Sequence, residues 1–441
     1  MVGLTPIEAR RARLLPSFRD FVDDALFHPR WGYYSTGVVR FGEGGHYDTF
    51  PTALSPLFGR MVAEAARRFW VRVGRPAAFE VCEIGAGNGQ LCLDTVATVM
   101  TRAADPAWRG FARAFRYRVI ERSPALVERQ RAKLGALATH VAWTCADLSR
   151  RRRRLRLGRH GFVVANEVLD CLAHHKIVRG DDGIARVVFV VPTRRGRTLD
   201  RGTLARALAN GDGAVRYRET ALPLAAVPGL RAFLARHCPE RLAMARPCPP
   251  YFACPDVPVL VRAVARLYDT AEMVWIDYGD LRPFHLRAPE HRRVFAGPPR
   301  SKRRVYDAPG RDDITFMVDF TVVADAARNA GLAVTYYGGQ SGLAHASGVE
   351  IGAAAVDLIA EARAVGWLLD VFGLGPERAW RQGGLTWSRH GARGGALRAG
   401  IARDVEEFLG RRPTRFRMMA LSSGPTVFRA ATRRRARRTG C

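Results

Sequence analysis

Lysine is almost absent from this chain of 441 residues: three of its 70 basic residues are lysines, and the other 67 are arginines. The formal net charge of +29 would ordinarily point to nucleic acid or an acidic membrane as a partner. These arginines, however, are spread along the chain among abundant alanine and glycine, a pattern typical of a coding bias. We therefore expect no nucleic-acid partner. Clusters of basic residues remain at 150–154, 300–304 and 433–438. They form either a solvated face or loose tail, or a surface that contacts RNA, lipid or an acidic protein.

The chain also lacks long apolar runs and closely paired cysteines. Its most apolar run, Val187–Val191, is far too short to span a bilayer, and its first residues contain no apolar signal core. The eight cysteines include no CxxC pair, so we expect reduced, buried thiols and a cytoplasmic location. We expect no metal, because the spacing of the one His and Cys group matches no standard zinc module. That group consists of His237, Cys238, Cys248 and Cys254.

From residue 79 onward, short apolar runs alternate with helical stretches. This alternation predicts parallel strands covered on both faces, and hence an α/β fold with a Rossmann-like, doubly wound, mostly parallel sheet. The predicted strands are Phe79–Ile84, Tyr117–Glu121, Val141–Cys145, Phe162–Asn166, Met273–Asp277, Ala333–Tyr337 and Phe416–Leu421. The predicted helices of this part are Gln90–Arg102, Pro124–Leu134, Phe320–Ala330, Gly352–Phe372 and Ala402–Leu409.

The chain divides into five predicted parts. A helical extension with a glycine-rich loop precedes the sheet, and its helices are Ser17–Leu26 and a second one from Pro56 through Trp70. The gap between the fourth and fifth strands is too long for one crossover, so we interpret it as an inserted lobe. The parts are the extension (1–75), the first part of the core (76–175), the inserted lobe (176–270), the second part of the core with the C-terminal helices and strand (271–425), and a basic tail (426–441).

A glycine-rich turn follows the first predicted strand. Residues 83–89 read Glu-Ile-Gly-Ala-Gly-Asn-Gly. Because glycine has no side chain beyond hydrogen, a ligand can closely approach the backbone amides at the N-terminus of the helix that follows. Gln90 stands where a dinucleotide-binding motif has its third glycine, which argues against NAD or FAD. We predict a sulfonium cofactor, S-adenosyl-L-methionine, whose amino-acid moiety lies over Gly85, Gly87 and Gly89. The alternative is a tight turn without a ligand.

Polar residues at the ends of the strands strengthen this prediction. Glu121 ends the second strand, where it can accept hydrogen bonds from both ribose hydroxyls, and Asp147 follows the third strand, where it can accept from the adenine amino group. Glu83 and Asn166 complete the predicted cofactor-binding residues. The alternative is that the three acids merely cap the helices that follow them.

Two carboxylates follow the fourth predicted strand. If the segment after Asn166 is helical, Glu167 and Asp170 project about 60° from each other and can both point at one substrate group. Two such carboxylates suit a cationic, planar acceptor such as a guanidinium. We predict Glu167 and Asp170 as the catalytic residues, with helix capping as the alternative role. His175 lies nearby as a proton acceptor or as a structural histidine.

Several segments, taken in order, resemble the methyltransferases typified by the mitochondrial complex I assembly protein that methylates arginine, together with their bacterial relatives. Residues 27–34 are similar to that family's NPxxGYY opening, and residues 42–59 resemble its GxxGDFxT loop. The glycine turn comes next. Residues 120–124 are similar to VExSP, 166–172 to NExxDAL, 277–279 to DYG, and 313–320 to DLTxHVDF.

The resemblance implies a class I methyltransferase fold, S-adenosyl-L-methionine as cofactor and a protein arginine as acceptor. His46, Ala173 and Met317 depart from the family's pattern, which indicates either a different acceptor or reduced activity. Three hypotheses therefore stay open: a protein arginine methyltransferase, a small-molecule methyltransferase, and a non-catalytic assembly or binding factor that keeps the fold.

Overall fold

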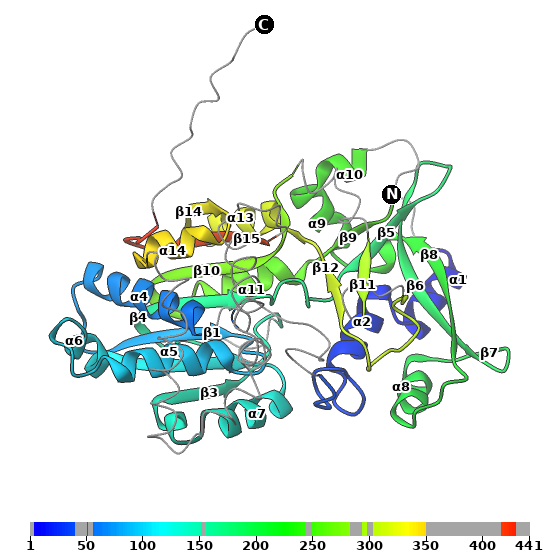
Figure 1. Cartoon of the computed structure of the whole chain (residues 1–441). Helices are drawn as coiled ribbons and strands as arrows, with labels where there is room; N and C mark the ends of the chain where they lie inside the picture. Colours follow the sequence, from blue (N-terminus) through cyan, green and yellow to red (C-terminus); the bar gives the residue numbers. More distant parts are fainter. Residues whose placement is uncertain are drawn as a thin grey trace, which may run out of the picture.

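A central sheet with helices on both faces forms the larger part of the molecule, and a second, smaller sheet forms a lobe beside it (Figure 1). The structure is a computed structural model, and it describes residues 4–39, 51, 56–150, 155–243, 249–282, 293–297, 303–349 and 416–428. The predicted helices Gly352–Phe372 and Ala402–Leu409, the position of His46, Cys248, most of the 42–59 loop and most of the basic tail lie outside the described residues.

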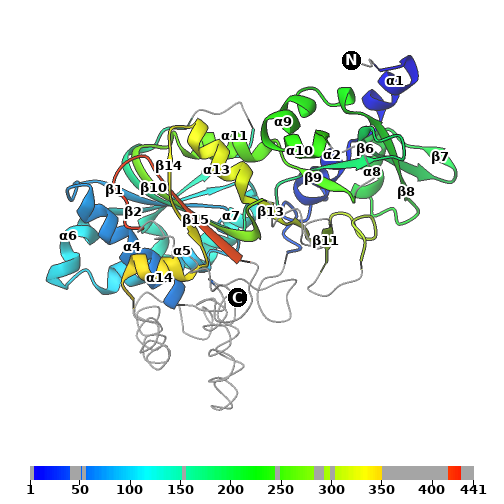
Figure 2. The ribbon, with the colours of Figure 1, turned by 90° about the horizontal axis from the view of Figure 1, so that it is seen from above.

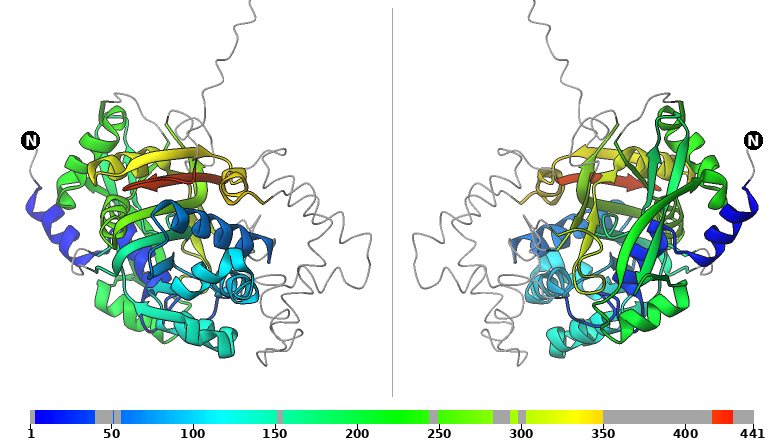
Figure 3. Two further views of the ribbon diagram at one scale, coloured as in Figure 1. Left: turned by 90° about the vertical axis from the view of Figure 1, so that its left-hand side faces the viewer. Right: turned by 90° about the vertical axis from the view of Figure 1, so that its right-hand side faces the viewer.

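The central sheet has the strand order β14-β15-β10-β4-β1-β2-β3, with β13 paired to β10. Strands β3, β2, β1, β4 and β10 run parallel, as the sequence predicts, whereas β15 is antiparallel to both of its neighbours. Figure 3 shows β14 and β15 side by side at one edge of the sheet. The strands are β1 Phe79–Ile84, β2 Phe115–Glu121, β3 Val141–Cys145, β4 Gly158–Asn166, β10 Tyr268–Asp280, β13 Val318–Asp319, β14 Ala333–Gly338 and β15 Phe416–Ser422.

Apolar residues from alternate positions of these strands form a core on each face of the sheet. In β10, for example, Val274 and Ile276 pack with α4 and α5 on one face, and Met273 and Trp275 pack with α11 and α13 on the other. Figure 2 shows these helices on opposite sides of the sheet. The helices of this part are α4 Leu57–Arg72, α5 Gln90–Thr101, α6 Pro106–Ala114, α7 Pro124–Leu134, α11 Asp256–Val264, α13 Phe320–Asn329 and α14 Ser341–Ser347, with a 3-10 helix at Gly135–His140.

The lobe is an antiparallel sheet with the order β7-β6-β5-β9, and β8 is paired to β6. It ends earlier than the sequence predicts, because α11 packs on α13 over the central sheet, so the predicted lobe (176–270) includes a core helix. The strands of the lobe are β5 His175–Arg179, β6 Ala185–Arg194, β7 Arg197–Thr198, β8 Arg216–Pro223 and β9 Tyr251–Ala253. Its helices are α8 Arg201–Ala209, α9 Leu230–His237 and α10 Pro239–Ala243, with a 3-10 helix at Leu224–Ala226.

The N-terminal helices pack against the lobe. Helix α2 (Phe18–Phe27) contacts β5 and β6, and it begins with a capping box in which Ser17 and Asp20 satisfy each other's backbone amides. Helix α1 (Pro6–Leu14) precedes it, and the hairpin of β11 (Val294–Ala296) and β12 (Ile314–Phe316) also joins this side. The sequence predicts the N-terminal extension as one part. In the structure, α1 and α2 pack with the lobe, and α4 packs on the central sheet.

Candidate active site

The carboxyl ends of β1, β2, β3 and β4 meet at one edge of the central sheet. The chain runs from β1 through β2 to β3 in one direction and then returns to β4 on the other side of β1. Such a switch point leaves a crevice between the strands, and α/β sheets bind ligands there. An open pocket of about 750 Å³, solvent at its mouth included, lies at this position. It is lined by Phe27, Tyr34, Ile84, Gly85, Gly87, Ile120, Glu121, Arg122, Leu126, Ala146, Asp147, Leu148, Ser149, Glu167, Val168, Cys171, Leu172 and Leu260.

The glycine turn forms one wall of the pocket. Gly85 has a φ of +67°, and an added Cβ would lie 3.0 Å from a methyl carbon of Val168 across the pocket wall. A side chain at this position would therefore be strained and would fill space that a ligand needs. The backbone amide of Gly89 donates to the carbonyl of Ala86 and begins helix α5. Gly85 and Gly87 line the pocket, whereas Gly89 does not.

Glu121 lies at the end of β2 and is buried. Its Oε1 accepts from the amide of Ser123 at 2.9 Å, and its Oε2 accepts from the side-chain amide of Gln130 at 3.2 Å. Burial raises the pKa of Glu121, and the hydrogen bonds to it oppose that shift. A carboxylate has about four acceptor positions, so Glu121 keeps capacity for further donors such as a ribose diol.

Asp147 also lines the pocket, but its carboxylate is already fully engaged. One oxygen accepts from the amide and hydroxyl of Ser149, and the other lies 3.1 Å from Nε of Arg122 and 3.4 Å from Nε of Arg150. These four contacts use about as many acceptor positions as a carboxylate has. An adenine amino group, which the sequence predicts as the partner of Asp147, would have to displace one of them.

Glu83 and Asn166 lie behind the pocket wall, not in the lining. Glu83 is buried and accepts a hydrogen bond of 2.7 Å from the hydroxyl of Tyr117. Its side chain is separated from the pocket because successive residues of a strand face opposite sides, and Ile84 is the neighbour that lines the pocket. Asn166 donates to Glu167, with Nδ2 and Oε1 3.0 Å apart. Asn166 therefore contacts the candidate catalytic acid, while direct cofactor contacts by Glu83 and Asn166 stay predictions.

Glu167 is the residue of the predicted catalytic pair that faces the pocket. It is one of only three described non-glycine residues with a positive φ, at +53°, a conformation that costs of order 1 to 3 kcal/mol and is frequent at functional sites. The amide of Asn166 and the hydroxyl of Tyr278, 3.1 Å from Oε2, hold its carboxylate in place.

The segment after Asn166 is a turn, not the helix on which the predicted pairing of Glu167 with Asp170 depends. The carboxylate of Asp277, on β10, accepts from the backbone amides of Leu169 and Asp170 and so fixes the turn. Asp170 is consequently buried, 3% exposed, and does not line the pocket. The two carboxylates therefore do not point into the same cavity.

A cluster of three buried acids, Asp170, Asp277 and Asp313, lies beside this turn. Burial raises the pKa of Asp277 to about 8, with the charge of Glu167 as the next cause, and burial raises that of Asp313 to about 6. Burial and the charges of Asp277 and Asp313 raise the pKa of Asp170 well above its usual value, and its Oδ1 has no hydrogen-bond partner within the described part of the chain. Tyr34, which lines the pocket, donates to Asp313 at 2.8 Å.

The histidines and cysteines that the sequence singled out and that the structure describes do not line the pocket; they are His175, His237, Cys238 and Cys254. Burial lowers the pKa of His175 to about 3, and His175 lies in β5, paired with Ala253 of β9. Cys238 contacts the hydroxyl of Tyr251 at 2.7 Å, and Cys254 contacts the carbonyl of Ala173. Over the described ranges, no three His, Cys, Asp or Glu side chains gather where they could hold a metal ion. None of the helices in those ranges combines the length and the apolar character that a bilayer span requires.

Sequence reasoning missed four residues that shape this site: Phe27, Tyr34, Arg122 and Gln130. Phe27 and Tyr34 belong to the segment similar to NPxxGYY, so a signal was present without a role attached to it. Arg122 immediately follows Glu121 and reads as an ordinary surface arginine. Gln130 lies nine residues after Glu121 on α7, and no motif marks it.

Curated proteins similar to this chain are arginine methyltransferases by name. "Protein arginine methyltransferase NDUFAF7 homolog, mitochondrial" of Drosophila melanogaster is 28% identical over 191 residues, which cover 40% of this chain and 42% of that protein. "Protein arginine methyltransferase NDUFAF7, mitochondrial" of Xenopus laevis is 24% identical over 180 residues, covering 37% and 39%. The matched part thus spans about two fifths of the length of these relatives.

Solved structures resemble the chain over almost its whole length. A "superfamily member and likely methyl transferase" from Burkholderia thailandensis, bound to S-adenosyl-homocysteine, has a TM-score of 0.63 at 21% identity and covers 97% of both chains. A native crystal structure from the same organism has a TM-score of 0.61 at 20% identity and covers 98% of both. At these identities the likeness shows the fold, which is the Rossmann-like class I methyltransferase fold predicted from the sequence.

The family model for S-adenosyl-L-methionine-dependent methyltransferases matches residues 61–338, which hold every strand end that lines the pocket. The pocket also has a wall formed by the glycine turn and an acid with spare acceptor capacity, as an adenosyl compound requires. Because the match covers more than half of the chain, the protein belongs to the S-adenosyl-L-methionine-dependent methyltransferases, with S-adenosyl-L-methionine as its cofactor.

Proposed function

We propose that this protein transfers the methyl group of S-adenosyl-L-methionine to an arginine side chain of another protein. The main support is the carboxylate of Glu167, which lines the cofactor pocket, is held by two hydrogen bonds and has a left-handed backbone conformation. The names of the two curated relatives agree with this acceptor.

The charge around Glu167 also favours a cationic acceptor. Asp277 is buried close to it, Asp170 and Asp313 belong to the same buried cluster, and within the described residues none of these three forms an ion pair with a basic side chain. The charge of Glu167 contributes to the raised pKa of Asp277, so a negative charge at this site disfavours the ionised form of Asp277. A guanidinium that arrives at Glu167 adds the opposite charge, whereas an anionic acceptor adds a further negative charge.

When bound, S-adenosyl-L-methionine supplies a methyl group that is activated by the positive charge of its sulfonium. The glycine turn and Glu121 hold that cofactor at the ends of β1 and β2. Glu167 pairs with the guanidinium and orients one of its nitrogens for attack. As the bond from this nitrogen to carbon forms, the sulfur–methyl bond breaks and leaves neutral S-adenosyl-homocysteine, and Glu167 accepts the proton that the nitrogen loses.

The proposal is tested by incubating the purified protein with methyl-labelled cofactor and a cell extract. We expect label in the protein fraction and methylated arginines after hydrolysis. Glu167→Gln should lower this transfer about 10²-fold or more while S-adenosyl-homocysteine binds as in the wild type, because only the charge is removed. Asp24→Asn on α2 is the control variant, because Asp24 pairs with Arg201 and neither residue lines the pocket.

Three results would contradict the proposal. Label confined to small molecules would assign the enzyme to another acceptor class. No transfer at all, despite normal cofactor binding, would favour a non-catalytic factor. Transfer that is unaffected by Glu167→Gln would remove Glu167 from the mechanism.

A further inference from the structure

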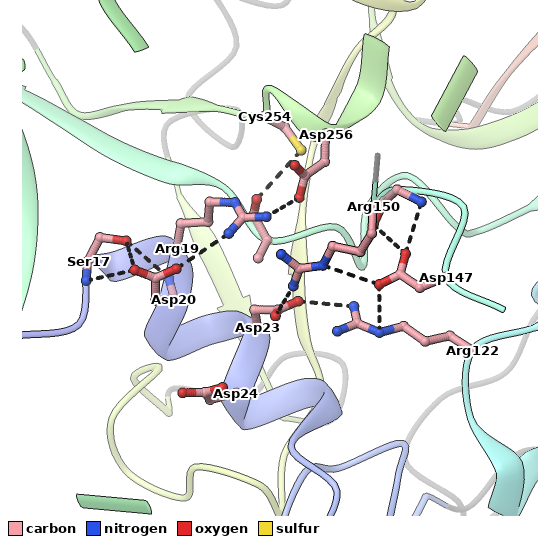
Figure 4. A network of polar contacts seen from close by, with 12 residues as sticks. Ser17, Arg19, Asp20, Asp23, Asp24, Arg122, Asp147, Arg150, Cys254 and Asp256 are labelled. Atoms are coloured by element: carbon pink, nitrogen blue, oxygen red, sulfur yellow. Dashed lines mark hydrogen bonds and ion pairs between the residues drawn. The ribbon is translucent and has the colours of Figure 1, made fainter. Parts of the chain in front are cut away.

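Four charged side chains form a closed ring at the rim of the cofactor pocket. Asp147 contacts Nε of Arg122 at 3.1 Å, Arg122 contacts Asp23 at 3.0 Å, Asp23 contacts Arg150, and Arg150 returns to Asp147 at 3.4 Å. Figure 4 shows the ring, with each aspartate between two arginines and each arginine between two aspartates. We call these four residues the charge ring. Asp23 lies on α2, whereas the other three residues follow strands β2 and β3 of the central sheet.

The charge ring shapes the pocket directly. Arg122 and Asp147 line it, and so does Phe27, which lies one helical turn after Asp23 on α2. The guanidinium carbon of Arg122 lies 3.9 Å from the ring centroid of Phe27, and Phe27 stacks on Tyr34 with 5.2 Å between centroids. One helix therefore contributes both an aromatic wall of the pocket and the acid that holds the neighbouring arginine.

The ring is balanced, and the loss of one acid would unbalance it. Asp23 and Asp147 compensate Arg122 and Arg150, and the side chains of Asp23 and Arg122 are only 13% and 25% exposed. Without the charge of Asp23, two arginines share one aspartate whose acceptor positions are already in use. Arg122 would then leave its position over Phe27 or repel Arg150, and either change alters the pocket wall.

We propose that Asp23 is a positioning residue of the cofactor pocket. Through the charge ring it fixes Arg122 and Asp147, which line the pocket together with Glu121. Binding of the cofactor and docking of α2 therefore depend on each other. The glycine turn and Glu167 lie outside the ring, and Asp23 does not act on them.

The chain offers a matched control on the same helix. Asp24, the next residue, pairs with Arg201 of α8 at 3.2 Å, and neither of these residues lines the pocket. Asp23→Asn and Asp24→Asn therefore each remove one charge from α2. The first affects two arginine contacts, both in the charge ring, and the second affects one contact outside it. Asp23→Glu restores the charge with one extra methylene group.

The test is calorimetric titration of the full chain with S-adenosyl-homocysteine, a probe without net charge at neutral pH, at about 0.05 M and about 0.5 M salt. We expect Asp23→Asn to weaken binding about tenfold, Asp24→Asn less than about twofold, and Asp23→Glu to recover most of the loss. Wild-type affinity should fall as salt screens the ring, and that dependence should be smaller in Asp23→Asn.

Thermal unfolding without ligand separates positioning from stability. The proposal is supported if only Asp23→Asn weakens binding at a temperature at which both variants are folded. It is overturned if Asp23→Asn binds as the wild type does, if Asp24→Asn weakens binding equally, or if the salt dependence is the same in wild type and Asp23→Asn. None of these outcomes depends on the identity of the methyl acceptor, so failure here leaves the proposed arginine methylation untouched.

Discussion

The side-chain amide of Gln130 donates to the carbonyl oxygen of Gly87, with Nε2 and the oxygen 3.0 Å apart. The same nitrogen lies 3.2 Å from Oε2 of Glu121, and Trp143 donates to the amide oxygen of Gln130. A single fully buried side chain of α7 thus connects the glycine turn to the acid that we expect to bind the ribose. The spacing between these two parts of the pocket is set by Gln130.

We predict that Gln130→Leu weakens S-adenosyl-homocysteine binding by about 1 to 2 kcal/mol, because a partly buried carbonyl and a buried carboxylate each lose a donor. Trp143→Phe is the matched control, since it removes the contact to the amide oxygen and leaves both donor contacts in place. Calorimetry on both variants checks the expectation. Equal losses of affinity would show that Gln130 acts only through general packing of α7.

Glu121→Ala should cost about 1.5 to 3 kcal/mol of cofactor binding, the range for hydrogen bonds to a charged group. The reason is that Glu121 retains acceptor capacity after its bonds to Ser123 and Gln130 are made. Titration with S-adenosyl-homocysteine measures this loss. An affinity equal to that of the wild type would remove Glu121 from the cofactor site.

The buried carboxyl of Glu83 should make stability depend on pH. Burial raises its pKa to about 7, against an ordinary value of 4.5, so the folded protein keeps a proton that the unfolded chain releases. This contribution is complete below about pH 4.5 and is lost as pH rises towards 7, by about 3 kcal/mol at most.

Glu83→Gln should remove that part of the dependence, because its amide stays neutral and still accepts from Tyr117. Urea unfolding between about pH 5 and about pH 7.5 measures it, and the stability of the variant relative to the wild type should rise with pH. A constant difference across this range would place the Glu83 pKa at its ordinary value. Because Glu83 does not line the pocket, affinity for S-adenosyl-homocysteine should change little.

Tyr278→Phe should lower the rate of methyl transfer several-fold without weakening S-adenosyl-homocysteine binding. The phenol hydroxyl holds Oε2 of Glu167, whereas the ring itself packs on Phe416 and keeps that contact in the variant. Transfer at saturating cofactor, compared with calorimetric affinity, separates the two effects. A loss of affinity with unchanged transfer would argue against a role for Tyr278 in positioning Glu167.

The elements that sequence reasoning predicted well are those with local determinants. Strands β1 and β3 and helix α7 have the predicted bounds, because apolar runs between turn residues, or Ser123 and Pro124 at a helix start, define them within a few residues. The class of cofactor followed from the spacing of Gly85, Gly87 and Glu121, and the family comparison confirms it.

What sequence reasoning could not reach depends on partners distant along the chain. Asp277, more than a hundred residues beyond the fourth strand, fixes the turn that buries Asp170, so local spacing alone suggested a helix. In the same way, the sequence predicts Asp147 as an acceptor for the cofactor, whereas in the structure Arg122 and Arg150 contact its carboxylate. The roles of the individual site residues stay predictions that the variants above test.

Strand β15 lies between β10 and β14, although it follows β14 by almost eighty residues along the chain. During synthesis, the edge of β10 that pairs with β15 stays unpaired until residues 416–422 have emerged and inserted. The nascent chain is therefore exposed to mispairing until β15 has been synthesised, and its methyltransferase core becomes complete only after residue 422 has emerged.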